Sequence, residues 1–270
     1  MVLRCPKCQQ ELTRDFDWHC VNNHHYDIAK EGYVNLVLAN QKHSTNPGDD
    51  ALSLKSRQQF LSHGYYQPLA EEISKIVVKY LDDGDSFLDA GCGSGYYLNY
   101  LVNNCTKKLN YYAVDIAKKG VAMCAKMNPE TICFVGNVFH LPIVDGSLTG
   151  LMSVFTPYSS EEFSRVVKDG GYVIAVSPGE KHLIEMKEIV YKQVYTNEET
   201  GYKLDDFTLI ERNKVTYVVT LEKQEDIETL WRMTPYYHTT YIGDSEKLLN
   251  YKQLTVTCDF LVSVYKRGVR

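Results

Sequence analysis

Three glycines within five residues follow a short apolar run in the segment LDAGCGSG, residues 88–95. Glycine is the usual residue where a ligand approaches the main chain closely, because it has no side chain to obstruct the contact. A loop between a strand and a helix also presents free amide groups at the helix N-terminus, and these amides favour phosphate and nucleoside groups. We therefore expect a nucleotide-binding loop at this point of the chain.

The sequence around this loop alternates short apolar runs with helical segments, which predicts βαβ units and a parallel sheet. The expected strands occupy residues 86–91, 109–115, 131–137, 147–155 and 170–178. Two further strand-like stretches, 207–221 and 254–266, flank a helical insert at 225–233. Apolar residues at helical spacing predict helices over 51–64 and 66–84, ended by Gly64 and Gly84, and another over 179–195.

The glycine spacing favours one nucleotide cofactor over others. Dinucleotide enzymes use G-x-G-x-x-G, whereas Gly91, Gly93 and Gly95 form G-x-G-x-G after Asp89. This pattern resembles the class I methyltransferases that use S-adenosylmethionine. An ordinary tight turn and a nicotinamide dehydrogenase are the alternatives.

Two polar residues at the ends of the following strands fit the same resemblance. Asp115 ends the second expected strand, about twenty residues after the last glycine, where a carboxylate can accept both ribose hydroxyls. Asn137 follows the third strand, at the place where such folds read the adenine edge. A helix N-cap is the alternative role for Asp115, because aspartate favours that position.

Three cysteines and several histidines lie close together near the N-terminus. Cys5, Cys8, Cys20 and His24 give a C-x2-C and C-x3-H pattern whose spacing lets two short turns close around a tetrahedral zinc ion. His19 and His25 compete with His24 for the fourth position, and His24 is preferred for its three-residue gap. A module this small has little core, and a bound metal can supply the missing stability. Free buried cysteines and a redox-active C-x-x-C are the alternatives.

The composition changes where this cysteine-rich segment ends. A polar stretch with an Asn-Pro-Gly turn signal follows it. We expect a zinc-finger module over 1–38, a linker over 39–50 and an α/β domain over 51–270. No apolar run is long enough for a membrane span, and the first ten residues lack the apolar segment of a secretory signal, so we expect a cytoplasmic protein with no membrane partner.

The net charge of −5 supplies no overall field that would attract a polyanion. The first fifty residues hold five Lys and Arg against seven Asp and Glu, so a nucleic-acid partner would have to meet a local basic patch. The candidate phosphate contacts are Lys7, Arg14, Lys30, Lys42 and Arg57.

Long strings in both halves resemble one family, the bacterial large-subunit rRNA guanine-N1 methyltransferases, in which a zinc finger precedes a methyltransferase domain. These strings include YDIAKEGYVNL (26–36), PGD (47–49), FLSHGYYQPL (60–69), GCGSGYY (91–97), EEFSRVVKDGGYVI (161–174), PGEKHL (178–183) and MTP (233–235). The resemblance implies an α/β fold with a Rossmann-like sheet, mostly parallel with an antiparallel C-terminal strand, after a small zinc-binding module. It also implies S-adenosylmethionine and structural zinc as cofactors, a hairpin of 23S rRNA as partner, and a homodimer.

The same resemblance implies roles for single residues. The zinc ligands would be Cys5, Cys8, Cys20 and His24, and the cofactor contacts would include Tyr66, Gly93, Ser94 and His182. The sequence departs from the usual pattern at Ser94, where the family commonly has Glu, and at Asn137, where many methyltransferases carry Asp. Ser94 still offers a hydrogen bond but no charge.

Methylation of guanine N1 requires the N1 proton to leave, and no residue of the sequence declares itself as the base. Near the cofactor the candidates are His182, Tyr66 and the loop 155–159, and Tyr158, Tyr236 or Tyr237 could stack on an extruded base. Two other functions fit the same motifs: methylation of a small molecule, and RNA binding by a zinc-bearing factor without turnover.

Overall fold

The computed structural model describes residues 2–38, 51–199 and 201–269. The linker expected over 39–50, with Lys42 and the PGD string, lies outside the described residues. Among the described helices, none combines the length and the apolar character that crossing a bilayer requires.

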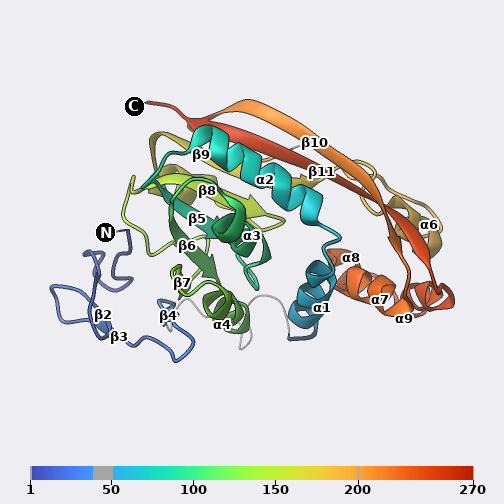
Figure 1. Cartoon of the computed structure of the whole chain (residues 1–270), viewed down its shortest axis with the longest axis horizontal. Coiled ribbons are helices and arrows are strands. Elements are labelled where there is room, and N and C mark those ends of the chain that lie inside the picture. The colour runs from blue at the N-terminus through green and yellow to red at the C-terminus, as the bar shows by residue number, and fades with distance from the viewer. Residues whose placement is uncertain (1, 39–50, 200, 270) are drawn as a thin grey trace.

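An eight-stranded sheet forms the centre of the molecule, in the order β10-β11-β9-β8-β5-β6-β7-β4 (Figure 1). Its strands are β4 (Val34–Asn35), β5 (Ser86–Ala90), β6 (Asn110–Asp115), β7 (Ile132–Val135), β8 (Leu148–Val154), β9 (Val167–Pro178), β10 (Phe207–Leu221) and β11 (Leu254–Arg267). Neighbouring strands are parallel except that β11 is antiparallel to both β9 and β10. The predicted α/β class with an antiparallel C-terminal strand is therefore confirmed.

Among the described helices, some follow single strands of the sheet, and those between β10 and β11 gather where β10 ends and β11 begins (Figure 1). The described helices are α1 (Ala51–Ser62), α2 (Gln67–Tyr80), α3 (Tyr96–Asn104), α4 (Lys118–Met127), α5 (Ser160–Val166), α6 (Ile184–Val190), α7 (Gln224–Arg232), α8 (Pro235–Thr239), α9 (Ile242–Ser245) and the 3-10 helix η2 (Glu246–Asn250). The helix α2 begins with Pro68 in its first turn and buries Leu69, Ile73 and Val77, which recur at helical spacing.

Two of the expected helices are shorter than their apolar patterns suggested. The helix α2 ends at Tyr80 because Leu81 adopts an extended backbone, and Gly84 lies in the turn beyond it. The helix expected over 179–195 is reduced to α6, because Leu183 has a left-handed backbone with φ +56°. The residues just before it form a loop that leads into the helix.

Alternating side chains of β5 build the cores on the two faces of the sheet. Phe87 belongs to the same core cluster as Leu69 and Ile73 of α2, whereas the next residue, Leu88, belongs to the cluster on the opposite face. On that face Leu88 belongs to a cluster that contains Trp18 of the N-terminal module. The module is therefore packed onto the large sheet through a shared core.

The N-terminal module has a small sheet of its own, made of β1 (Thr13–Arg14), β2 (Trp18–His19) and β3 (His25–Tyr26). The last residues of the predicted module leave this small sheet and join the large one. In particular, β4 runs parallel to β7, with Val34 opposite Phe134. A bridge between Leu3 and Ile143 makes a second connection.

The packing of α3 against α4 yields a prediction about Gly95. A Cβ atom at Gly95 would lie 2.6 Å from Cys124 Sγ, and the backbone φ is +86°. We expect Gly95→Ala to lower the free energy of unfolding by about 1–2 kcal/mol through the left-handed backbone and by a further ~1–3 kcal/mol through overpacking. Urea denaturation measures this loss.

The matched control is Gly84→Ala, because Gly84 also has φ +86° but a Cβ atom there meets no atom within 4 Å. This variant should show only the backbone cost. Equal losses for the two variants would contradict a packing role for Gly95.

Candidate active site

A cavity of about 880 Å³ opens at the carboxyl ends of the parallel strands. Residues at or just beyond the ends of five strands line it: Gly91, Asp115, Asn137, Val154 and Ser177. In the sheet, β6 lies on one side of β5 and β8 lies on the other, so the strand order reverses at β5. Ligands of open α/β sheets bind at such a reversal. The volume lies within the range of small-molecule sites, about 300–1,000 Å³.

The predicted glycine loop forms one wall of this cavity. Gly91 and Gly93 line it, whereas Gly95 is not among the lining residues and instead begins α3 against Cys124. A Cβ atom at Gly91 would lie 2.3 Å from the side chain of Thr156. Glycine at 91 therefore lets the loop after β8 pack directly on the loop after β5.

Asp115 holds the glycine loop in place from the end of β6. Its Oδ2 accepts a hydrogen bond from the Gly93 amide at 2.8 Å, and its Oδ1 accepts one from the Ala117 amide at 2.7 Å. The second bond stabilises the turn before α4. Asp115 therefore lies two residues before the N-cap of α4, which is Ala117, and is not the N-cap itself. A carboxylate oxygen can accept more than one hydrogen bond, so both oxygens can also receive ribose hydroxyls.

Asp89 is buried in β5 and lines the cavity beneath the loop. Burial, together with negative charge on the neighbouring Cys124 and Asp115 side chains, raises the pKa of Asp89 well above its ordinary value. A cationic group of a ligand in this part of the cavity would favour the ionised form of Asp89. The methionine amine of S-adenosylmethionine is such a group.

Tyr66 and His182 lie together in the cavity wall, with 3.5 Å between Tyr66 Oη and His182 Nε2. The backbone amide of Asp259 donates to His182 Nδ1, so the proton of the neutral ring is on Nε2. Burial, with the positive charge of Lys187, lowers the pKa of His182 to about 3. Near neutral pH His182 is therefore neutral, and its Nε2–H faces the Tyr66 hydroxyl oxygen.

Asn137 and Ser94, the two departures from the usual motif, both line the cavity. Asn137 Oδ1 accepts the Phe139 amide at 3.0 Å, which leaves its NH₂ group to donate. Such a donor suits a ring nitrogen of adenine. Ser94 is buried beside the loop glycines.

Several residues of the cavity were not expected there. Arg57, predicted as a phosphate contact, lines the cavity, and its Nη2 donates to the Met233 carbonyl oxygen at 3.4 Å. Tyr202, which no sequence motif marked, also lines it. Of the three tyrosines expected to stack on a base, only Tyr236 is a lining residue.

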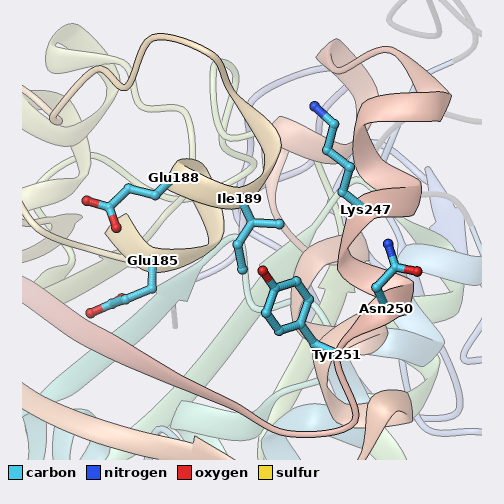
Figure 2. A pocket seen from close by; sticks show the side chains of 6 residues that line it. All are labelled: Glu185, Glu188, Ile189, Lys247, Asn250 and Tyr251. Carbon is cyan, nitrogen blue, oxygen red and sulfur yellow. The ribbon is translucent and has the colours of Figure 1, made fainter.

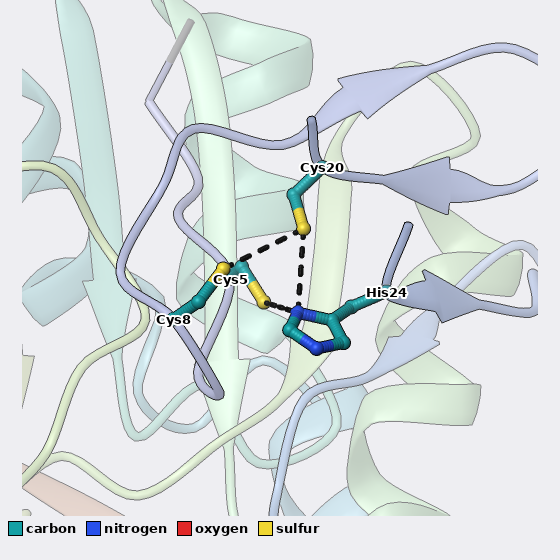
Figure 3. A group of neighbouring side chains, drawn as sticks. All are labelled: Cys5, Cys8, Cys20 and His24. Carbon is teal, nitrogen blue, oxygen red and sulfur yellow. Dashed lines mark hydrogen bonds between the residues drawn. The ribbon is translucent and has the colours of Figure 1, made fainter. Parts of the chain in front are cut away.

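The four predicted zinc ligands come together in the N-terminal module (Figure 3). Cys8 Sγ lies 3.6 Å from Cys20 Sγ, and His24 Nδ1 lies 3.4 Å from the Sγ atoms of Cys5 and Cys20. With Zn–S near 2.3 Å and Zn–N near 2.0 Å, the ligand atoms of a tetrahedral site are roughly 3.5–3.8 Å apart. Three sulfurs and one imidazole nitrogen at this spacing fit a closed, structural zinc site.

The two competing histidines lie outside this group of four. His19 Nδ1 is 3.1 Å from Asp17 Oδ1, and His25 Nδ1 is 2.7 Å from Asp17 Oδ2. Their rings are stacked, with 5.5 Å between centroids. The geometry therefore favours His24 as the fourth ligand.

A second cavity, of about 630 Å³, lies between α6 and η2 (Figure 2). It contains none of the predicted site residues. Two of its three charged lining residues already have partners within the chain: Glu185 accepts hydrogen bonds from Thr257, and Lys247 pairs with Asp244 at 2.6 Å. The cavity at the strand ends remains the candidate active site.

The zinc cluster yields a prediction about two adjacent histidines. We expect His24→Ala to lose bound zinc, because only three ligands would remain, and His25→Ala to keep the zinc content of the wild type. Elemental analysis of protein purified without chelator measures both. Retention of zinc by His24→Ala together with its loss from His25→Ala would reverse the assignment.

Comparison with known families agrees with this geometry. Residues 3–45 match the zinc-ribbon model described as RlmA, N-terminal, and residues 88–175 match a methyltransferase domain model. The two matches cover the zinc cluster and the strands that carry the glycine loop, Asp115 and Asn137.

Three curated relatives match most of the chain. One, assigned as a 23S rRNA (guanine-N(1)-)-methyltransferase from Micromonospora griseorubida, is 30% identical over 68% of this chain and 68% of that protein. The 23S rRNA (guanine(748)-N(1))-methyltransferase of Streptomyces fradiae is 30% identical over 68% of this chain and 66% of that protein. YxjB of Bacillus subtilis strain 168, assigned to the same activity, is 27% identical over 87% of this chain and 86% of its own length.

The relatives and the two domain models agree with each other, and they confirm the resemblance found in the sequence. A zinc ribbon and a methyltransferase domain that uses S-adenosylmethionine are thus combined in one polypeptide. The chain belongs to the 23S rRNA (guanine-N1)-methyltransferase family.

Proposed function

We propose that the chain is a cytoplasmic enzyme that transfers a methyl group from S-adenosylmethionine to N1 of a guanine in a hairpin of 23S rRNA. One observation carries the proposal: a single cavity joins the polar wall of Asp89, Gly93 and Asp115 to an aromatic wall that includes Phe155 and Tyr236. The polar wall suits a nucleoside cofactor, and the aromatic wall suits a flat heterocycle. The names of the curated relatives support this acceptor.

In the proposal the cofactor is positioned mainly by the ends of β5, β6 and β7. Asp115 accepts the ribose hydroxyls, Asn137 donates to the adenine ring, and Asp89 faces the methionine amine. The other proposed contacts are Tyr66, Gly91, Gly93, Ser94 and His182, all of which line the cavity. When bound, S-adenosylmethionine supplies the methyl group on its sulfonium, so alignment of the acceptor is the main task of the protein.

The proton on guanine N1 must leave during methylation, and the state of His182 bears on where it goes. His182 Nδ1 is engaged by the Asp259 amide and its Nε2 carries a proton, so it donates a hydrogen bond and does not accept the N1 proton. Burial raises the pKa of Tyr66 well above its ordinary value, so this phenol also stays protonated. We therefore assign the leaving proton to water at the mouth of the cavity, where Pro157 is exposed.

We propose that the zinc-ribbon module, residues 1–38, extends the RNA-binding surface of the methyltransferase domain. Lys7, Arg14 and Lys30 are exposed on it and can contact phosphates. The Arg14 guanidinium lies 5.9 Å from the centre of the Trp18 ring, and this cation–π contact holds the Arg14 side chain against the module surface. A homodimer is a further expectation, which rests on the family resemblance alone.

The acceptor is tested by incubating the zinc-loaded protein with labelled S-adenosylmethionine and an unmodified transcript of 23S rRNA hairpins, followed by digestion and nucleoside analysis. We expect N1-methylguanine as the labelled nucleoside. Label in small molecules of a cell extract but not in RNA would favour a small-molecule methyltransferase. Tight RNA binding without transfer would favour a binding factor.

The cofactor site yields a prediction about Asp115. Asp115→Asn removes the charge and one of the two acceptor oxygens, and charged hydrogen bonds contribute about 1.5–3 kcal/mol each. We expect the affinity for S-adenosylmethionine to fall about 10- to 100-fold, measured by titration calorimetry.

The control is Asp83→Asn, because Asp83 also accepts a backbone amide, that of Lys108 at 2.7 Å, but lies outside the cavity. Its affinity should equal that of the wild type. An Asp115→Asn variant with unchanged affinity would remove Asp115 from the proposed contacts.

A further inference from the structure

Phe155 has a backbone conformation that a bulky residue rarely adopts. It directly follows β8, and its φ is +55°, in the left-handed region that glycine and asparagine tolerate far better. The residue is 43% exposed and lines the cavity. A strained backbone of this kind persists only where the surrounding structure enforces it, and such residues concentrate at functional sites.

The surrounding loop is held from two sides. The Phe155 amide donates to the Val176 carbonyl oxygen of β9 at 3.2 Å. On the other side, the Tyr202 hydroxyl donates to the Thr156 carbonyl oxygen at 3.0 Å. These bonds fix the backbone that aims Phe155 at the cavity.

The loop is also in contact with the cofactor side of the cavity. The Thr156 side chain occupies the space that a Cβ atom of Gly91 would need. The position of Phe155 is therefore set relative to the glycine loop, and hence relative to a nucleoside bound there.

The neighbouring tyrosines are committed to other contacts. Tyr158 is stacked on Tyr202, with 3.9 Å between ring centroids and 9° between planes. Tyr236 has the Lys187 ammonium 4.8 Å from its ring centre, and its hydroxyl donates to Asn197 Oδ1 at 2.9 Å. The ring of Phe155 lies against those of His182 and Phe260, and the residue is still 43% exposed.

We propose that the ring of Phe155 is a stacking subsite for the acceptor base, a purine turned out of the RNA. This inference rests on the proposed function and adds a residue that selects and orients its substrate. An extruded base is bound by stacking on aromatic side chains, because every base has a flat π face. The ring at 155 then places the purine edge toward the methyl group while the loop keeps that placement rigid.

The test compares Phe155→Leu and Phe155→Gly with Phe155→Tyr. Leucine keeps an apolar side chain without an aromatic face, glycine removes the ring and the backbone strain together, and tyrosine keeps the ring. For the first two variants we expect the KM for the RNA substrate to rise about 5- to 140-fold, the range that corresponds to the loss of one stacked base. For Phe155→Tyr, which keeps the ring, we expect a KM for the RNA close to that of the wild type.

Calorimetry with S-adenosylmethionine shows whether each variant keeps a folded cofactor site. We expect every variant to bind S-adenosylmethionine with the affinity of the wild type. Tyr195→Leu is the matched control, because Tyr195 is 69% exposed and is not a lining residue of the cavity. If the wild type is active and both the leucine and glycine variants have its KM for RNA, the stacking subsite is wrong but the proposed function stands. Absence of RNA methylation by the wild type would overturn the proposed function as well.

Discussion

The hydrogen bond between the Gly93 amide and the Asp115 carboxylate is the contact on which the candidate site depends. It joins the loop after β5 to the end of β6, two neighbouring parallel strands, and so gives the glycine loop its shape. The same carboxylate bonds to the Ala117 amide and directs the chain into α4, whose Gly120 lies against Gly93. A single side chain thereby organises the loop, the following helix and the proposed ribose contact.

The N-terminal module is built into the protein at two levels. Its Cys5, Cys8, Cys20 and His24 form the zinc cluster, while Trp18 belongs to the core on one face of the large sheet. Beyond the cluster, β4 becomes the edge strand next to β7. A metal ion that orders the module would therefore also order one face and one edge of the methyltransferase sheet, which gives the zinc a structural role beyond its own small domain.

Local patterns in the sequence were enough to predict much of this structure. The strands, the glycine loop and the zinc cluster follow from spacing and periodicity, because each depends on residues near one another in the chain. The short α6, the pairing of β4 and the place of Tyr202 depend on contacts between distant segments, which no local pattern records. The conformation of Phe155 also depends on distant segments. The sequence indicates that its loop, 155–159, lies near the cofactor, but contacts with β9 and Tyr202 hold the loop that contains its left-handed backbone.

The contact between Gly91 and Thr156 has a consequence for how such an enzyme can change over generations. A larger residue at 91 would have to displace Thr156, and with it the loop that carries Phe155, the proposed stacking residue. Mutations that retune recognition of the methyl donor would then alter the choice of substrate as well. In the proposed site, the loop that binds the methyl donor and the loop that faces the acceptor would therefore have to change together.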